Sequence, residues 1–167
     1  EAGKLSRGFS LLELIIYIGV TIMVVVVMTE LVVVMLKVRE RDLVEREVQQ
    51  NLRFAVSRLE RALTQATAVT GSYPSDTLTL TIGGASTVFS LSGGSSGTFQ
   101  INEAGAGAVG LTTSKVTVSA FSAGNMFTKI SNPSPAKDSV QIKIKVEYVT
   151  GGKPALTASA SSQTTVE

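Results

Sequence analysis

The chain contains no cysteine, no histidine and no tryptophan. Without cysteine it has no disulfide, no thiolate nucleophile and no Cys-ligated zinc, and without histidine it lacks the usual general base and the commonest metal ligand. Most enzyme classes lose their chemistry in this way, so we expect no enzymatic activity and no cofactor. The absence of cysteine does not identify the compartment, because an exported protein can do without disulfides.

The chain also lacks a large excess of either positive or negative charge. The 167 residues include 15 basic and 13 acidic side chains, and the formal net charge is +2. From Gly71 to Glu167 there are six basic residues against five acidic ones. Neither balance resembles the basic surface of a nucleic-acid-binding protein, so no nucleic-acid partner is evident. Aromatic residues make up 5% of a chain that is 44% hydrophobic, so the apolar side chains are mainly aliphatic.

What the chain does contain is a long apolar run. A short polar head, residues 1–8, carries Lys4 and Arg7, which favour the cytoplasmic side of a membrane. Phe9–Leu36 then has two acidic side chains and no basic one. As a helix, this segment would be roughly 42 Å long, enough to cross a hydrocarbon core of about 30 Å. Its valine runs favour strands in water, but lipid requires every backbone group to be satisfied internally, which favours a helix.

The next segment, residues 37–70, is charged and amphipathic. Apolar side chains recur at steps of three and four on one face, the pattern of a helix that buries one stripe; they are Val44, Val48, Leu52, Val56, Leu59, Leu63 and Ala66. Gly71 and Pro74 supply a stop. We therefore predict one continuous helix from about Phe9 to Val69.

The remaining segment, residues 71–167, alternates with a period of two and is rich in Gly, Ser and Thr, which predicts strands. The candidates are Thr77–Ile82, Thr87–Leu91, Thr98–Ile101, Lys115–Phe121, Met126–Ile130 and Val140–Thr150. Tight turns are expected at Gly83-Gly84 and Gly151-Gly152, and a longer hairpin loop at Gly93–Gly97. The apolar face of Val140–Tyr148 is the expected partner of the helical stripe. The predicted fold class is α+β, with one long N-terminal helix packed on a C-terminal antiparallel β-sheet domain.

The junction of head and apolar run carries the motif RGFSLLE at positions 7–13. It resembles the processing signature of type IV prepilins, with a basic leader, Gly followed by Phe, a glutamate as fifth residue of the processed chain, and a following apolar helix. The resemblance implies a pilin-like fold, a leader at residues 1–8, cleavage by prepilin peptidase between Gly8 and Phe9, and methylation of the new N-terminus at Phe9. It also implies that Glu13 serves in assembly.

Physical chemistry gives Glu13 the same role. A carboxylate in a hydrophobic segment costs about 2.5 to 3.5 kcal/mol to insert, so it needs a compensating partner. Cleavage would create a cationic amine at Phe9, with which a neighbouring subunit's Glu13 could pair. The alternative is that Glu13 snorkels to the interface of an ordinary signal anchor. A second carboxylate, Glu30, lies about 32 Å along the helix from Phe9, near the outer end of the span, where interfacial exposure would explain it.

The run Gln49–Glu60 is similar to the helix of W-type minor pilins and J-type minor pseudopilins, although the cysteine pair common near pilin C-termini is absent. The resemblance implies a single-pass protein of the cytoplasmic (inner) membrane that enters an extracytoplasmic filament. Its implied partners are the membrane, other pilin or pseudopilin subunits, prepilin peptidase, an assembly platform protein and an ATPase. The competing hypothesis is a membrane-anchored binding module whose helix is only a tether.

Overall fold

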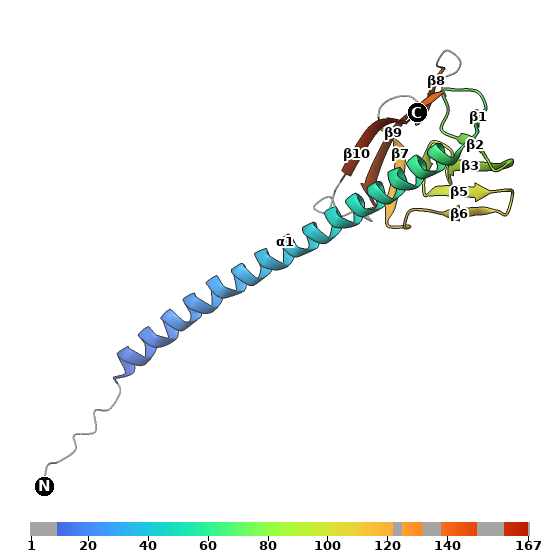
Figure 1. Ribbon diagram of the computed structural model, residues 1–167. Coiled ribbons are helices and arrows are strands. Elements are labelled where there is room, and N and C mark those ends of the chain that lie inside the picture. The colour runs from blue at the N-terminus through green and yellow to red at the C-terminus, as the bar shows by residue number, and fades with distance from the viewer. Residues whose placement is uncertain (1–9, 122–124, 132–137, 150–158, 167) are drawn as a thin grey trace, which may run out of the picture. The chain divides into compact units, whose positions relative to one another are not determined.

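The computed structural model describes residues 10–121, 125–131, 138–149 and 159–166 (Figure 1). The chain forms two compact units, residues 1–40 and residues 41–167. Within the described ranges, the helix α1 (Leu11–Gln65) precedes ten strands. The strands are β1 (Ala68–Thr70), β2 (Leu78–Ile82), β3 (Ala85–Leu91), β4 (Ser96–Gly97), β5 (Phe99–Glu103), β6 (Ala108–Gly110), β7 (Val116–Ala120), β8 (Phe127–Ile130), β9 (Ser139–Tyr148) and β10 (Ser159–Val166).

The described part of the first unit is helical from Leu11 onward, as predicted from the apolar run. The hydroxyl groups of its two threonines are satisfied locally. The hydroxyl of Thr21 donates to the Tyr17 carbonyl oxygen at 2.7 Å, and that of Thr29 donates to the Val25 carbonyl oxygen at 2.8 Å. Hydrogen bonds of this kind let threonine lie in an apolar helix without leaving an unpaired hydroxyl group.

In the second unit, the predicted stripe of α1 is buried. The buried residues of the stripe in α1 are Val44, Val48, Leu52, Leu59 and Leu63. All of them except Val44 belong, together with the strands, to one continuous hydrophobic core. Val56 packs at the edge of this core and is only half-buried. Three further buried positions on the helix were not predicted, namely Asn51, Ala55 and Ala62. The stripe is therefore wider than the sequence pattern indicated.

The predicted end of the helix is wrong. α1 ends at Gln65, and Ala68–Thr70 forms β1 instead of a last helical turn. β1 pairs antiparallel with β2, with Val69 opposite Leu80. The β-branched residues here favour a strand, and β2 supplies the hydrogen-bonding partner that decides between the two conformations.

Two antiparallel sheets follow. The first has the strand order β1-β2-β3-β5-β6, and the second has β10-β9-β7-β4, with β8 also paired to β9. The hairpin between β2 and β3 turns at Gly83-Gly84, as predicted, and both glycines have positive φ (58° and 83°). Ile82 and Ala85 are paired, so two residues form the turn between them. Such a turn needs a left-handed backbone conformation, which glycine adopts without steric cost.

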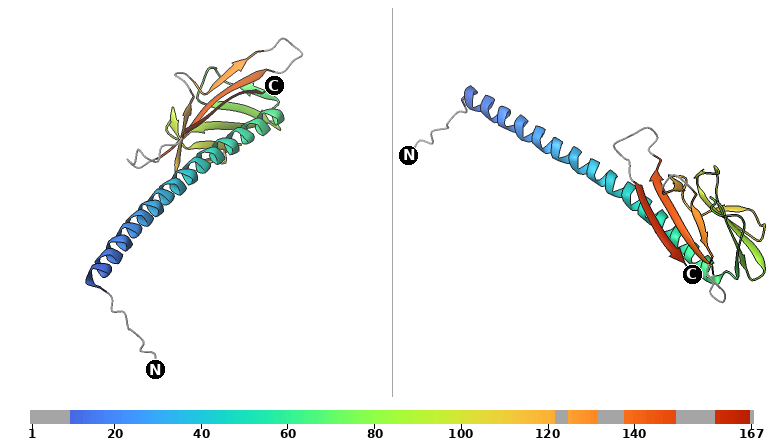
Figure 2. Two further views of the ribbon diagram at one scale, coloured as in Figure 1. Left: turned by 90° about the vertical axis from the view of Figure 1, so that its left-hand side faces the viewer. Right: turned by 90° about the horizontal axis from the view of Figure 1, so that it is seen from above.

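The strand β9 organises the second sheet. Its residues Val140, Ile142, Ile144 and Val146 are fully buried, which confirms the predicted face. β10 pairs along one edge of β9, while β7 and β8 share the other edge. Figures 1 and 2 show β9 and β10, in orange to red, beside the part of α1 that belongs to the same unit.

The strand predictions hold for six segments, with ends shifted by one or two residues. The strands β1, β4, β6 and β10 were not predicted from the sequence. The glycine-rich loop Gly93–Gly97 does join β3 to β5, but its last two residues pair with β7 as β4. The predicted turn at Gly151-Gly152 lies outside the described residues. The protein is thus an α+β fold with one long N-terminal apolar helix and antiparallel sheets, an arrangement consistent with a pilin-like fold.

Candidate functional site

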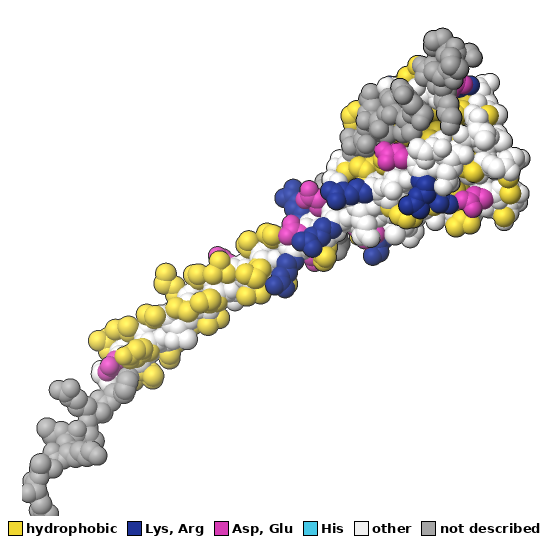
Figure 3. Space-filling model, in the orientation of Figure 1, with side chains coloured by type: hydrophobic (Ala, Val, Ile, Leu, Met, Phe, Trp, Pro, Cys, Tyr) yellow, Lys and Arg dark blue, Asp and Glu magenta, His cyan; other side chains and the backbone are white. Residues whose placement is uncertain are grey.

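The first candidate site is the surface of residues Leu11–Leu36. Every large apolar side chain in this range is 44–76% exposed (Figure 3). Soluble monomers rarely expose contiguous apolar patches beyond a few hundred Å². Near the N-terminus the structure therefore has a helix that is long and apolar enough to cross a membrane, which is compatible with a single-pass anchor.

Glu13 lies in the first turn of this helix. Its backbone N–H donates to the Ser10 carbonyl oxygen at 3.0 Å, and the Leu14 N–H donates to the same oxygen at 3.2 Å. A carboxylate in the first turn faces the positive end of the helix dipole, which stabilises it by about 0.3–1 kcal/mol at an exposed position. That is less than the cost of about 2.5–3.5 kcal/mol for a charge at the centre of a membrane helix. The helix alone does not compensate a Glu13 buried in lipid or in a helix bundle.

The other two residues of the predicted processing site, Gly8 and Phe9, lie outside the described residues. The structure therefore places one member of the predicted set, Glu13, at the start of α1. Their adjacency remains a property of the sequence.

Glu30 is the second carboxylate on the apolar surface. The residues one turn away on the helix are all valines: Val26, Val27, Val33 and Val34. Within the described part of the chain Glu30 makes no salt bridge. A charge with only aliphatic neighbours is stable in water at a membrane interface, or beside a cation that another molecule supplies.

A buried amide fixes α1 to the loop after β6. Asn51 is 7% exposed. Its Oδ1 accepts a hydrogen bond from the Thr113 N–H at 3.0 Å, and its Nδ2 donates to the Glu47 carbonyl oxygen at 2.8 Å. The hydroxyl of Thr113 donates to Glu47 Oε1 at 2.9 Å. The two bonds to Thr113 join residues 62 and 66 positions apart and so fix the position of the helix against the loop.

The role of Asn51 was not predicted from the sequence, although a signal was present. The residue lies three positions after Val48 and four before Ala55, so it falls on the buried face of the helix. An amide at such a position needs partners, because an unpaired buried polar group is costly. The sequence cannot name Thr113 as the partner, since nothing local relates the two.

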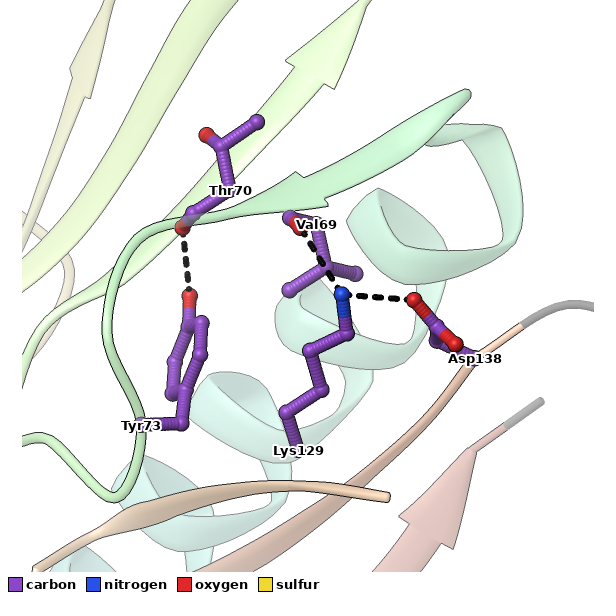
Figure 4. A network of polar contacts seen from close by, with 5 residues as sticks. All are labelled: Val69, Thr70, Tyr73, Lys129 and Asp138. Atoms are coloured by element: carbon purple, nitrogen blue, oxygen red, sulfur yellow. Dashed lines mark hydrogen bonds and ion pairs between the residues drawn. The ribbon is translucent and has the colours of Figure 1, made fainter. Parts of the chain in front are cut away.

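A second polar network begins at Tyr73, in the loop between β1 and β2 (Figure 4). Its hydroxyl donates to the Thr70 carbonyl oxygen at 3.0 Å and accepts from the Thr79 N–H at 3.1 Å. Burial raises the pKa of Tyr73 above its usual value, while the Thr79 N–H and the charge of Lys129 act in the opposite direction. The neutral phenol is the form that fits this network.

The same network reaches the second sheet through Lys129 of β8. The Lys129 ammonium pairs with Asp138 Oδ2 at 2.6 Å and donates to the Val69 carbonyl oxygen at 3.4 Å (Figure 4). Nearby, the backbones of Ser75 and Phe127 exchange two hydrogen bonds of 3.0 and 2.8 Å. The loop after β1, in the first sheet, is thus fastened to β8, in the second sheet.

A shallow groove of about 450 Å³ lies beside the edge strand β6. Phe54, Val109 and Leu111 contribute apolar walls, and Arg58 and Glu103 form an ion pair of 2.6 Å at its rim. Figure 3 shows basic and acidic side chains next to apolar ones on this unit. Both members of the ion pair are well exposed, so the pair contributes little to stability. The groove presents a surface for contact and not an acid–base pair.

Among the described residues, no group of three acidic, histidine or cysteine side chains could hold a metal ion. The chain matches no protein-family model, no curated protein and no solved structure. What the structure establishes is therefore a class: an α+β protein whose N-terminal helix is able to cross a membrane.

Proposed function

We propose that this chain is a non-enzymatic subunit, and a minor one, of a type IV pilus or a type II secretion pseudopilus. The observation that supports this most is the position of Glu13. It lies in the first turn of a helix with an exposed apolar surface, four residues after Phe9 of the Arg-Gly-Phe sequence at residues 7–9.

The proposed mechanism is assembly after cleavage. Hydrolysis of the peptide bond between Gly8 and Phe9 releases the polar leader and leaves an α-amine, which is cationic near neutral pH. In a dry bundle of helices, this amine pairs with Glu13 of a neighbouring subunit. The uncut chain has an amide and a charged leader at that place, so it cannot dock in the same way. Assembly therefore waits for cleavage.

The apolar surface of Leu11–Leu36 then serves twice. In the membrane it faces lipid, and in the filament it packs against equivalent helices, so that lipid is exchanged for protein. On this proposal, the subunit is a single-pass protein of the cytoplasmic (inner) membrane before assembly and part of an extracytoplasmic filament afterwards. Its partners are other pilin or pseudopilin subunits, the prepilin peptidase, a platform protein and an assembly ATPase.

The decisive measurement is the N-terminus of the protein in cells. Intact mass spectrometry of membrane-extracted subunit should give a chain that begins at Phe9, with one added methyl group. The same mass should be found in sheared filaments. A chain that keeps residues 1–8 in cells with an active prepilin peptidase would support the tethered binding module instead.

A variant tests the amine-pairing step separately. Glu13→Gln should still be cleaved after Gly8, yet its incorporation into filaments should fall by about tenfold or more, because the buried amine loses its counter-charge. Glu40→Gln is the matched control, since Glu40 is an exposed acid of the same helix beyond the apolar run. Equal incorporation of the two variants would refute the pairing.

A further inference from the structure

Glu30 and Lys37 bear unpaired opposite charges on the outer part of the apolar helix. Neither makes a salt bridge within the described residues. Lys37 is the nearest basic residue to Glu30, but seven residues separate them on one helix, about 10.5 Å along its axis. Both side chains are exposed. Neither charge is paired within the part of the chain that the structure describes, although Glu40 lies three residues from Lys37 on the same helix, so both charges are available to another molecule.

We propose that Glu30 of one copy of this chain forms an ion pair with Lys37 of the neighbouring copy in the assembled bundle. The inference rests on the proposed function, because it uses the contact between Glu13 and the Phe9 amine. It adds a second contact, about 30 Å further along the helices, which fixes the register of two subunits at both ends of the apolar segment.

The axial positions follow from the first contact. On the proposed function, the helix of the processed chain continues to its first residue, Phe9. To bring Glu13 of one parallel helix level with Phe9 of the next, two such helices must be displaced by four residues, about 6 Å. The same displacement brings Val34 of the first helix level with Glu30 of the second. Lys37 then lies three residues beyond this level, about 4.5 Å along the axis. A lysine stem of four methylene groups can span that distance and reach the carboxylate.

The positions around the helix axis also allow the contact. In two helices that wind around each other, positions one heptad apart return to the same face of the helix. Glu30 lies three heptads after Phe9, and Val34 lies three heptads after Glu13. Glu30 and Val34 therefore face each other as Phe9 and Glu13 do. Lys37 is three residues after Val34, a neighbouring position on the same helical face.

The contact has a direction. The helix that supplies Glu13 also supplies Lys37, and the helix that supplies the amine also supplies Glu30. In the reverse combination, eleven residues or about 16.5 Å would separate the two charges along the axis. One pair of neighbours thus shares two bridges of opposite polarity, which opposes sliding of one helix along the other.

Exchange of the two charges tests the proposal. Glu30→Lys and Lys37→Glu should each lower incorporation into filaments by about tenfold or more, because two like charges then meet in an apolar bundle. The double variant should recover to within about threefold of the original chain. Glu30→Lys combined with Arg41→Glu is the matched control and should not recover, since Arg41 lies seven residues beyond the level of Glu30, about 10.5 Å.

Incorporation is measured relative to the processed subunit in the membrane, so a variant that merely inserts poorly is not counted as an assembly defect. Single variants that assemble normally, or a double variant that does not recover, would overturn the inference. Those results would instead fit Glu30 in interfacial water and Lys37 beside Glu40 of its own helix.

Cross-linking tests the register while both charges stay in place. The chain has no cysteine, so any disulfide comes from the introduced residues. Filaments that contain a mixture of Met23→Cys and Val27→Cys subunits should give disulfide-linked dimers. Met23 and Val27 lie two heptads after Phe9 and Glu13, and level, facing positions meet the Cα separation of about 4.4–6.8 Å that a disulfide needs. A mixture of Met23→Cys and Thr29→Cys should give few dimers, because Thr29 lies two residues after Val27 and faces away. Equal yields would overturn the proposed register.

Failure of this inference is distinguishable from failure of the proposed function. If the original chain begins at Phe9 and enters filaments while the charge exchange and the cysteine pairs fail, only the contact between Glu30 and Lys37 is wrong. If the original chain keeps its leader and is absent from filaments, the proposed function itself is wrong.

Discussion

Replacement of Asn51 by alanine tests how the second unit holds its part of α1. The Asn51 amide accepts from the Thr113 N–H at 3.0 Å and donates to the Glu47 carbonyl oxygen at 2.8 Å. Alanine removes both hydrogen bonds. It leaves the Thr113 N–H without its acceptor, in a contact that is partly buried.

The magnitude follows from these two bonds. Loss of a partner from a buried donor costs about 1–3 kcal/mol, and a typical intramolecular hydrogen bond contributes about 0.5–1.5 kcal/mol net. The bond to the Glu47 carbonyl oxygen matters less, because a carbonyl in mid-helix already has a backbone donor. We expect the free energy of unfolding to fall by about 2 kcal/mol, which for a unit of this size lowers Tm by roughly 4–10 °C.

The measurement is urea denaturation of the full chain in detergent, followed by circular dichroism of the β structure, since the chain has no tryptophan. Gln50→Ala is the control, because Gln50 is the preceding residue and is exposed. It should change the free energy of unfolding by less than about 0.5 kcal/mol. An Asn51→Ala variant as stable as Gln50→Ala would show that the amide does not fix the helix to the loop.

Three other predictions concern the second unit. Leu59→Ala should lower the free energy of unfolding by about 2–5 kcal/mol in the same assay, because Leu59 is 0% exposed; a loss below about 1 kcal/mol, near that of a single methylene group, would contradict its place in the core. Gly97→Ala should lower the urea midpoint more than Gly94→Ala, although both glycines have positive φ. A Cβ at Gly97 would come within 2.5 Å of Ser92 Oγ, whereas a Cβ at Gly94 meets no atom within 4 Å. Equal losses in the urea midpoint would refute this reasoning. Burial raises the pKa of Tyr73, so the phenol of the unfolded state loses its proton at a lower pH than that of the folded state, and the free energy of unfolding should fall as pH rises above about 10. Tyr73→Phe should flatten this pH dependence. If the slope of stability against pH is unchanged in the variant, other groups cause it.

Sequence patterns predicted those elements whose conformation depends on their own residues. The helix from Leu11 onward follows from an aliphatic run without proline, and its buried face from Val48 to Leu63 follows from the helical period of the apolar positions. The buried face of β9 follows from strict alternation, and the turn at Gly83-Gly84 follows from glycine's freedom at positive φ. In each case the signal lies within the element itself.

The missed elements are strands that exist because a neighbour pairs with them. β6 is three exposed residues that follow a turn with two glycines, and β10, with the sequence SASSQTTV, has almost no apolar alternation. The backbone of β10 is ordered by pairing with eight residues of β9, from Val140 to Glu147. A strand that is held by backbone hydrogen bonds needs no particular side chains, so its sequence carries little signal.

The features of the candidate sites also fall into those that the sequence predicts and those that depend on tertiary contacts. The processing motif at residues 7–13, the apolar run and the charges of Glu30 and Lys37 can be read directly from the order of residues, because a helix has a constant rise per residue and so turns sequence spacing into position. The end of α1 at Gln65, the partner of Asn51 and the hydrogen bond from Lys129 of β8 to Val69 of β1 depend on segments far apart in the chain. Such contacts form only after the strands have paired, and no local pattern encodes them.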